Sequence, residues 1–310
     1  MMNELCRTEA ANPQASSSAS AQSASMLAAW VGQLLEDVRR THVARFQQLR
    51  PKLQSDAFAW DNALLTHSVQ GWLAASRNLD FQLLRRRGFW ARLTRGAEGA
   101  AREFGRTYEG VLSAAAKARQ EFEMLSRDYR AHTSSERRLI VELDIESRAL
   151  NREIDQGADW LVELSCTIEK ADELRGFSTR AMALSGELKR LRAASTLGRE
   201  ITLLGQNVLE RRTALLEMLK FDLHGFDKVW VQRLSNIRKK AVDRQVPLPA
   251  LETAWEVHCE LLTRLERTSA ACLALQMEEQ AMARRLAMLR GCLEGPATSV
   301  PAPLPSAFNF

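Results

Sequence analysis

Large apolar side chains recur every three or four residues along most of the chain. The most regular stripe lies in residues 250–293, and its inward positions are Val257, Leu261, Leu265, Thr268, Cys272, Leu275, Glu279, Met282, Leu286, Leu289 and Leu293. This spacing places the side chains on one face of an α-helix. We therefore expect one long amphipathic helix here, ended by Gly295-Pro296.

A second long stripe lies in residues 101–175. Positions 122, 125, 129, 132, 136, 139 and 143 hold Phe, Leu, Tyr, His, Glu, Leu and Leu, and the stripe continues through Ser147, Leu150, Ile154, Gly157, Leu161, Leu164, Ile168 and Ala171. The two steps of four around Leu143 are a stutter, which locally unwinds a coiled coil. Two interpretations remain: one unbroken helix ended near Gly176, or a break near residue 133, because Thr133-Ser134-Ser135-Glu136 matches a capping box.

Four further helices are expected from shorter stripes, at residues 26–49, 55–84, 178–195 and 199–244. Arg50-Pro51 is expected to end the first of them, since proline disfavours helix in the residue before it. A kink is expected at residues 196–197, and a local irregularity at His224-Gly225. Pro247-Leu248-Pro249 is expected to end the fourth helix.

The distribution of proline supports long helices over sheets. The chain has 310 residues with 8 prolines, and none lies between Lys52 and Val246. A sandwich, barrel or doubly wound fold of that length would need many turns, which use proline and glycine. The sequence therefore predicts an all-α fold, an elongated bundle of long antiparallel helices with coiled-coil character.

Composition shifts along the chain predict five consecutive regions. Residues 1–25 are rich in Ser, Ala and Gln and are expected to form a disordered leader. Residues 26–84 are expected to form an N-terminal helical hairpin, 85–96 a basic junction, and 97–293 the long-helix coiled-coil bundle. Residues 294–310 are expected to be a flexible, proline-rich tail.

Charge and cysteine content point to a cytoplasmic protein. The formal net charge is +5, which permits acidic partners without requiring nucleic acid. The five cysteines include no CxxC pair, as is typical of a reducing compartment. No targeting segment and no apolar run long enough to span a bilayer is visible, so we expect a cytoplasmic location, with peripheral membrane attachment left open.

Sequence signals for catalysis are absent. The chain has no GxGxxG, GxxxxGK[ST], HExxH or GxSxG motif, and its five histidines are scattered. No Glu-x-x-His pair occurs, which is the pattern that helical bundles use to hold metal. We therefore expect no enzyme activity, no catalytic residue, no metal site and no cofactor.

The basic junction is the strongest candidate binding site. Its candidate anion- or partner-binding residues are Arg85, Arg86, Arg87, Phe89, Trp90, Arg92 and Arg95. Guanidinium groups bind phosphate through paired hydrogen bonds, and aromatic side chains insert at membrane interfaces or stack on bases. The alternative is an exposed basic hinge whose two aromatic residues anchor it to the bundle. An acidic membrane surface is the favoured anionic partner over nucleic acid.

Three segments in order give the chain a family resemblance. They are the basic junction Arg85–Gly96 leading into a long charged coiled coil, then Trp160-Leu161-Val162-Glu163-Leu164, then Gln206-Asn207-Val208-Leu209-Glu210-Arg211-Arg212. Over residues 85–245 this layout resembles the toxic anion resistance (TelA/KlaA) family. The resemblance implies an all-helical cytoplasmic protein linked to tellurite and other stress resistance. It implies no catalytic mechanism and transfers no functional residue.

Two function classes follow from these observations. The first is a non-enzymatic helical scaffold or interaction protein that binds a partner protein, or a second copy of itself, through helical faces. The second is a peripheral binder of anionic membrane or nucleic acid through the basic junction.

Overall fold

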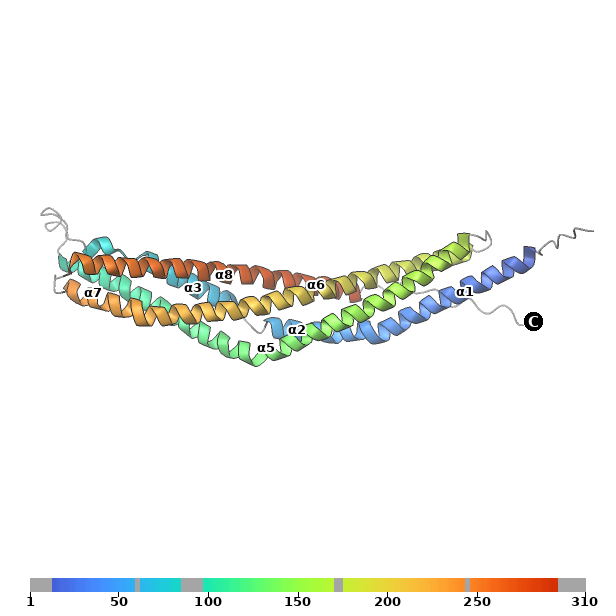
Figure 1. Cartoon of the computed structure of the whole chain (residues 1–310), viewed down its shortest axis with the longest axis horizontal. Helices are drawn as coiled ribbons and strands as arrows, with labels where there is room; N and C mark the ends of the chain where they lie inside the picture. The colour runs from blue at the N-terminus through green and yellow to red at the C-terminus, as the bar shows by residue number, and fades with distance from the viewer. Residues whose placement is uncertain (1–12, 59–61, 85–96, 170–174, 243–245, 295–310) are drawn as a thin grey trace, which may run out of the picture. The chain divides into compact units, whose positions relative to one another are not determined.

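A computed structural model describes residues 13–58, 62–84, 97–169, 175–242 and 246–294 (Figure 1). In these ranges the backbone forms helices and no strand, which confirms the predicted all-α class. The elements are α1 (Pro13–Val38), the π-helix η1 (Arg39–Val43), α2 (Ala44–Phe58), α3 (Asn62–Arg77), the 3₁₀ helix η2 (Phe81–Leu84), α5 (Ala97–Glu169), α6 (Arg175–Gly225), the π-helix η4 (Phe226–Val231), α7 (Gln232–Val242) and α8 (Leu248–Glu294).

The chain divides into two compact units. Unit 1 comprises residues 1–53, 139–203 and 284–310, and unit 2 comprises residues 54–138 and 204–283. Each unit is assembled from separated stretches, because α2, α5, α6 and α8 each contribute residues to both. The sequence had predicted consecutive regions instead.

The helix α5 runs without interruption through the expected break near residue 133. Thr133 does not cap a helix start, because its Oγ1 donates a hydrogen bond to the carbonyl of Tyr129 one turn earlier. Glu136 does not reach back to that cap either, because it is buried and bound to Arg212. The one-helix prediction is therefore confirmed, and the capping-box interpretation is wrong.

Several expected helix boundaries are also wrong. Pro51 lies inside α2, where it is exposed, so the carbonyl that loses its N–H partner can bind water. Gly176 lies in the first turn of α6 and does not end a helix. α6 continues without interruption through residues 196–197, so the two helices expected on either side of them are one helix, and Thr196 Oγ1 donates to the Arg192 carbonyl at 3.0 Å.

The first helices differ from expectation in length. α1 begins at Pro13, not near Met26, so part of the expected disordered leader is helical. The helix expected over residues 55–84 is divided between the end of α2, α3 and η2. A hydrogen bond from the Gln82 backbone N–H to Asp80 Oδ1 (2.7 Å) supports the turn into η2.

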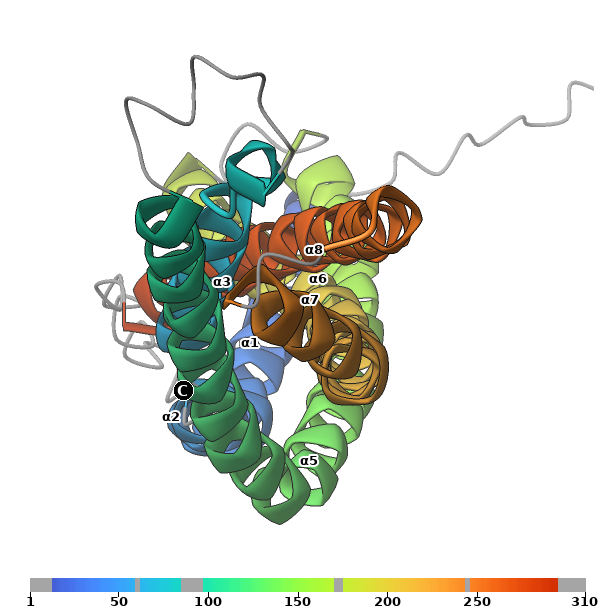
Figure 2. The same ribbon diagram turned by 90° about the vertical axis from the view of Figure 1, so that its left-hand side faces the viewer.

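The irregularity expected at His224-Gly225 is confirmed, because α6 gives way there to the π-helix η4. Phe226 and Trp230 of η4 are buried and stacked, with ring centroids 4.7 Å apart. Trp230 also stacks on Tyr108 of α5 at 5.4 Å. These rings belong to the aromatic core of unit 2, to which α3, α5, α7 and α8 contribute; the four helices are foreshortened in Figure 2.

In unit 1, two glycines allow close approach between helices. A Cβ atom on Gly157 would lie 2.8 Å from Leu34 Cδ2, and one on Gly198 would collide with Ser147 Oγ. Gly157 lies on the predicted stripe of α5, where its lack of a side chain admits Leu34 of α1.

The stripe predicted for the last helix is confirmed almost completely. Every position of it is buried in α8 except Val257, which is half-buried. Glu279 is among the buried positions, as is Glu136 on the stripe of α5. A carboxylate inside a helical core requires a partner, and this requirement leads to the first candidate site.

Candidate functional site

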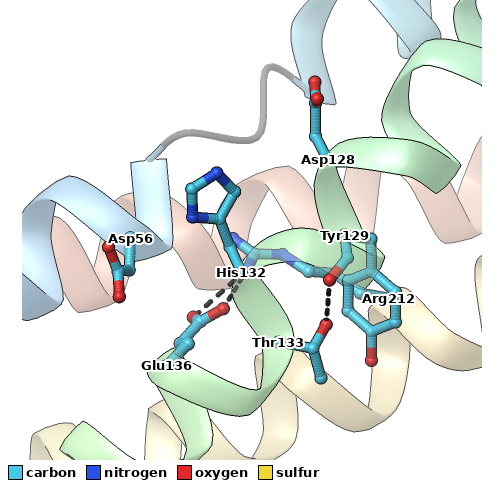
Figure 3. Close-up of a pocket in the computed structure, with 7 residues that line it drawn as sticks. All are labelled: Asp56, Asp128, Tyr129, His132, Thr133, Glu136 and Arg212. Atoms are coloured by element: carbon cyan, nitrogen blue, oxygen red, sulfur yellow. Dashed lines mark hydrogen bonds and ion pairs between the residues drawn. The ribbon is translucent and has the colours of Figure 1, made fainter.

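A buried ionic cluster joins three helices within unit 2. Glu136 of α5, Arg212 of α6 and Glu279 of α8 point toward one another from the inward faces of their helices, and Arg212 is only 1% exposed. Figure 3 shows Arg212 reaching across to Glu136. We call these three residues the Arg212 cluster.

All three nitrogen atoms of the Arg212 guanidinium group donate hydrogen bonds. Its Nη1 donates to both carboxylate oxygens of Glu136, at 3.2 and 2.9 Å, and its Nε and Nη2 donate to Glu279 Oε1 at 3.0 and 2.9 Å. Nη2 also donates to the backbone carbonyl of Ala57 at 2.6 Å. The planar fork of arginine suits this arrangement, and it ties the end of α2 to the other three helices.

Two carboxylates face one guanidinium in this cluster. Burial raises the pKa of Glu136 and of Glu279, and the opposing charge of Arg212 lowers both by less. A hydrogen bond from Asn62 also favours the charged form of Glu279. The cluster therefore holds protons more readily than exposed carboxylates do.

The space beside the cluster is too small for a substrate. Its volume is about 10 Å³, and it is lined by Asp56, Asp128, Tyr129, His132, Thr133, Glu136 and Arg212 (Figure 3). This volume accepts one water molecule. The geometry therefore fits a role in setting helix register, and it does not fit substrate binding.

A second site is a larger groove between α5 and α6 within unit 1. Its volume is about 580 Å³, and we call it the α5–α6 groove. Its floor and walls are mainly apolar. The lining residues are Ile154, Ala158, Leu161, Val162, Ser165, Cys166, Ser178, Ala181, Met182, Ser185, Leu188, Lys189 and Arg192.

The α5–α6 groove exposes apolar surface at its rim. Val162 is 65% exposed and Met182 is 64% exposed, while Leu161 and Leu188 below them are buried. The two charged residues among those that line the groove are both basic. One of these, Arg192, donates to Asp155 of α5, so an exposed ion pair links the two helices at that end.

Buried His258 lies in the aromatic core of unit 2. Its Nδ1 accepts a hydrogen bond from Trp230 Nε1 at 3.1 Å, and burial lowers its pKa to about 4. Phe81 and Trp255 also lie against the ring. The imidazole is therefore neutral and has a partner, as expected of a structural core residue.

The described ranges lack two other kinds of site. They contain no group of three or more His, Cys, Asp or Glu side chains arranged to hold a metal ion. None of the helices in these ranges has the length and apolar character needed to cross a membrane.

The binding residues predicted from the sequence are not tested by the structure. Arg85, Arg86, Arg87, Phe89, Trp90, Arg92 and Arg95 lie outside the described residues. They stay predictions.

Sequence reasoning missed both the Arg212 cluster and the α5–α6 groove. A signal for the Arg212 cluster was present, because Glu136 and Glu279 occupy core positions of two stripes and each needs a cation. The pattern did not show which arginine supplies it. For the α5–α6 groove, the α5 stripe predicted residues on the floor. It could not predict which residues at the rim stay exposed, because their exposure depends on where the neighbouring helices end.

Comparison with known proteins gives no relative of this chain. No family model matches it, and neither the curated proteins nor the solved structures contain a match.

Proposed function

We propose that this chain is a non-enzymatic helical interaction protein that binds an amphipathic helix of a partner protein in the α5–α6 groove. The observation that carries this proposal is the apolar groove of about 580 Å³ with Val162 and Met182 exposed at its rim. Apolar grooves between two helices are suited to a third helix that presents residues at a spacing of three and four.

The groove indicates the chemistry of the partner helix. Its α6 side runs from Ser178 to Arg192, which is about 21 Å of helix at 1.5 Å per residue. A partner stripe of about four turns therefore fills it. Because Lys189 lies along it, acidic residues beside the stripe would add a favourable charge contact, whereas Arg192 is already paired with Asp155.

The physiological setting that we propose is tellurite and related toxic-anion stress. This part rests on the resemblance of residues 85–245 to the TelA/KlaA family. If it holds, expression of the chain should raise the tellurite tolerance of a sensitive bacterial host, and the groove variant Met182→Asp should not.

Binding of a designed helix tests the proposed interaction. The probe is a 21-residue synthetic peptide with Leu at heptad positions a and d and Glu at e and g, labelled for fluorescence anisotropy. We expect saturable binding to the full chain. We expect Met182→Asp to weaken it at least tenfold, or about 1.4 kcal/mol, because it places a carboxylate on the apolar rim facing the acidic helix.

Matched controls separate groove binding from general adhesion. Met277→Asp makes the same change at a methionine that is 71% exposed on α8 in unit 2, and it should bind like the parent chain. A peptide with Lys in place of Glu should bind more weakly. Equal binding by the two aspartate variants would contradict the proposal.

A further inference from the structure

The α5–α6 groove continues the surface of α6 on which α8 is seated within unit 1. Arg285 of α8 forms an ion pair with Glu200 of α6 at 2.7 Å. Met182 lies eighteen residues before Glu200, which is about five full turns at 3.6 residues per turn. The two side chains therefore project from the same face of α6.

The helix α8 ends where the groove begins. α8 runs antiparallel to α6 (Figure 1), and nine residues separate Arg285 from the end of α8 at Glu294. Counting back nine residues from Glu200 puts Glu294 level with about Leu191 of α6, since both helices rise by the same distance per residue. The groove then extends from Arg192 toward Ser178, with no further residue of α8 to cover it.

The residues that follow α8 match this surface in chemistry and reach. Residues 295–310 (GPATSVPAPLPSAFNF) carry no charged side chain and include Val300, Leu304, Phe308 and Phe310. At about 3.1 Å per residue, a proline-rich segment of this length spans about 50 Å, more than twice the length of the groove.

We propose that residues 295–310 occupy the α5–α6 groove of their own chain and compete with the partner helix for it. This inference rests on the proposed function, because it concerns the regulation of the same groove. The segment covers the exposed apolar rim through its leucine and phenylalanine side chains. It has no Asp or Glu side chain to pair with Lys189, so an acidic amphipathic helix competes with it through charge contacts that the segment's side chains cannot make.

The alkylation rate of Cys166 reports whether residues 295–310 cover the groove. Cys166 lines the groove and its side chain is exposed among the described residues, so a covering segment slows its reaction with a thiol reagent. The experiment measures the alkylation rate of Cys166 in the full chain by mass spectrometry of its peptide. Half-buried Cys259 in unit 2 serves as the internal reference.

Two sets of three substitutions test which tail side chains hold the contact. The first is Leu304→Asp, Phe308→Asp and Phe310→Asp together, and the second is Thr298→Asp, Ser299→Asp and Ser306→Asp together. Both add three negative charges outside the described helices, so neither is expected to change folding. We expect the first set to speed Cys166 alkylation about tenfold, and the second to leave it within twofold of the parent chain.

Three results would overturn the inference. The first is equal alkylation rates in all three proteins, and the second is equal acceleration by both sets. The third is a rate in the parent chain that falls with rising protein concentration, which would show that the segment of another copy covers the groove.

The same assay keeps this inference separate from the proposed function. Addition of the Leu/Glu peptide should protect Cys166 in the variant with Leu304→Asp, Phe308→Asp and Phe310→Asp. Protection by the peptide with no effect of the tail variants would refute the tail contact and leave partner binding intact. Failure of the peptide to protect Cys166 in any of the proteins would refute the proposed function itself.

Discussion

Arg212 restricts how the helices of unit 2 pack together. Apolar side chains pack in several registers at similar free energy, whereas a guanidinium group with two carboxylates and a carbonyl is satisfied in one. A slip of one turn in α5 or α8 would leave a buried charge without its partner. We infer that the main effect of the Arg212 cluster is to favour one alignment of the helices over alternative alignments. Its contribution to the free energy of unfolding is smaller.

Replacing Arg212 tests this role. Arg212→Met leaves Glu136 and Glu279 buried without a cation, so the free energy of unfolding should fall by about 3–5 kcal/mol. The combined change Glu136→Leu, Arg212→Met and Glu279→Leu should restore stability to that of the parent chain or above, since it removes all three buried charges. Urea unfolding followed by circular dichroism measures both, and a triple variant as unstable as Arg212→Met would contradict the account.

The lowered pKa of buried His258 predicts that the folded chain loses stability in acid. Its pKa is about 4 in the folded chain against 6.5 ordinarily, so the unfolded chain binds the proton more tightly. The contribution of neutral His258 to the free energy of unfolding is therefore fully present above pH 6.5, and it is lost as the pH falls toward 4. Over that range the loss amounts to about 3 kcal/mol.

A pair of histidine variants isolates this effect. Unfolding measured between pH 4 and 7 should depend less steeply on pH in His258→Gln than in the parent chain. His67→Gln removes an exposed histidine and should keep the parent slope. Parallel pH profiles for all three proteins would show that His258 does not control the acid response.

Among the secondary-structure elements, the hydrophobic periodicity predicted the helices correctly, but several predicted helix boundaries were wrong. Most of the positions predicted as inward on the stripes of α5 and α8 are buried, because burial along a long helix follows its 3.6-residue period. The α5 stripe was incomplete, since His132 is exposed and the buried Phe104 and Tyr108 were not part of it.

Pro51, Gly176 and the capping box at Thr133 are local signals. Tertiary contacts outweigh them where a helix is packed along its length, as Glu136 shows by binding Arg212.

The continuity of α5 has a direct test at Ser134. This residue is exposed in the middle of α5, so Ser134→Pro should lower the free energy of unfolding by about 3 kcal/mol. If a helix instead started after Thr133, residue 134 would be its first position, where proline is well tolerated. Ser134→Ala is the control and should be neutral or slightly stabilising in chemical unfolding.

At the scale of the whole molecule, the candidate site depends on where helices stop. The α5 stripe predicted apolar residues that line the floor of the α5–α6 groove, namely Ile154 and Leu161. It could not show that α8 ends level with about Leu191 of α6, because that level depends on the register between two helices. Uncovered apolar surface of this kind commonly marks an interaction site.

The most direct test of the central claim locates the bound helix on the chain. The Leu/Glu peptide carries a photoreactive benzoylphenylalanine at a central apolar position, and the crosslinked residues are identified by mass spectrometry. We predict crosslinks to Val162, Met182 and their neighbours in the α5–α6 groove, and we predict that Met182→Asp abolishes them while Met277→Asp does not. Crosslinks confined to unit 2, or spread evenly over the exposed apolar residues, would contradict it.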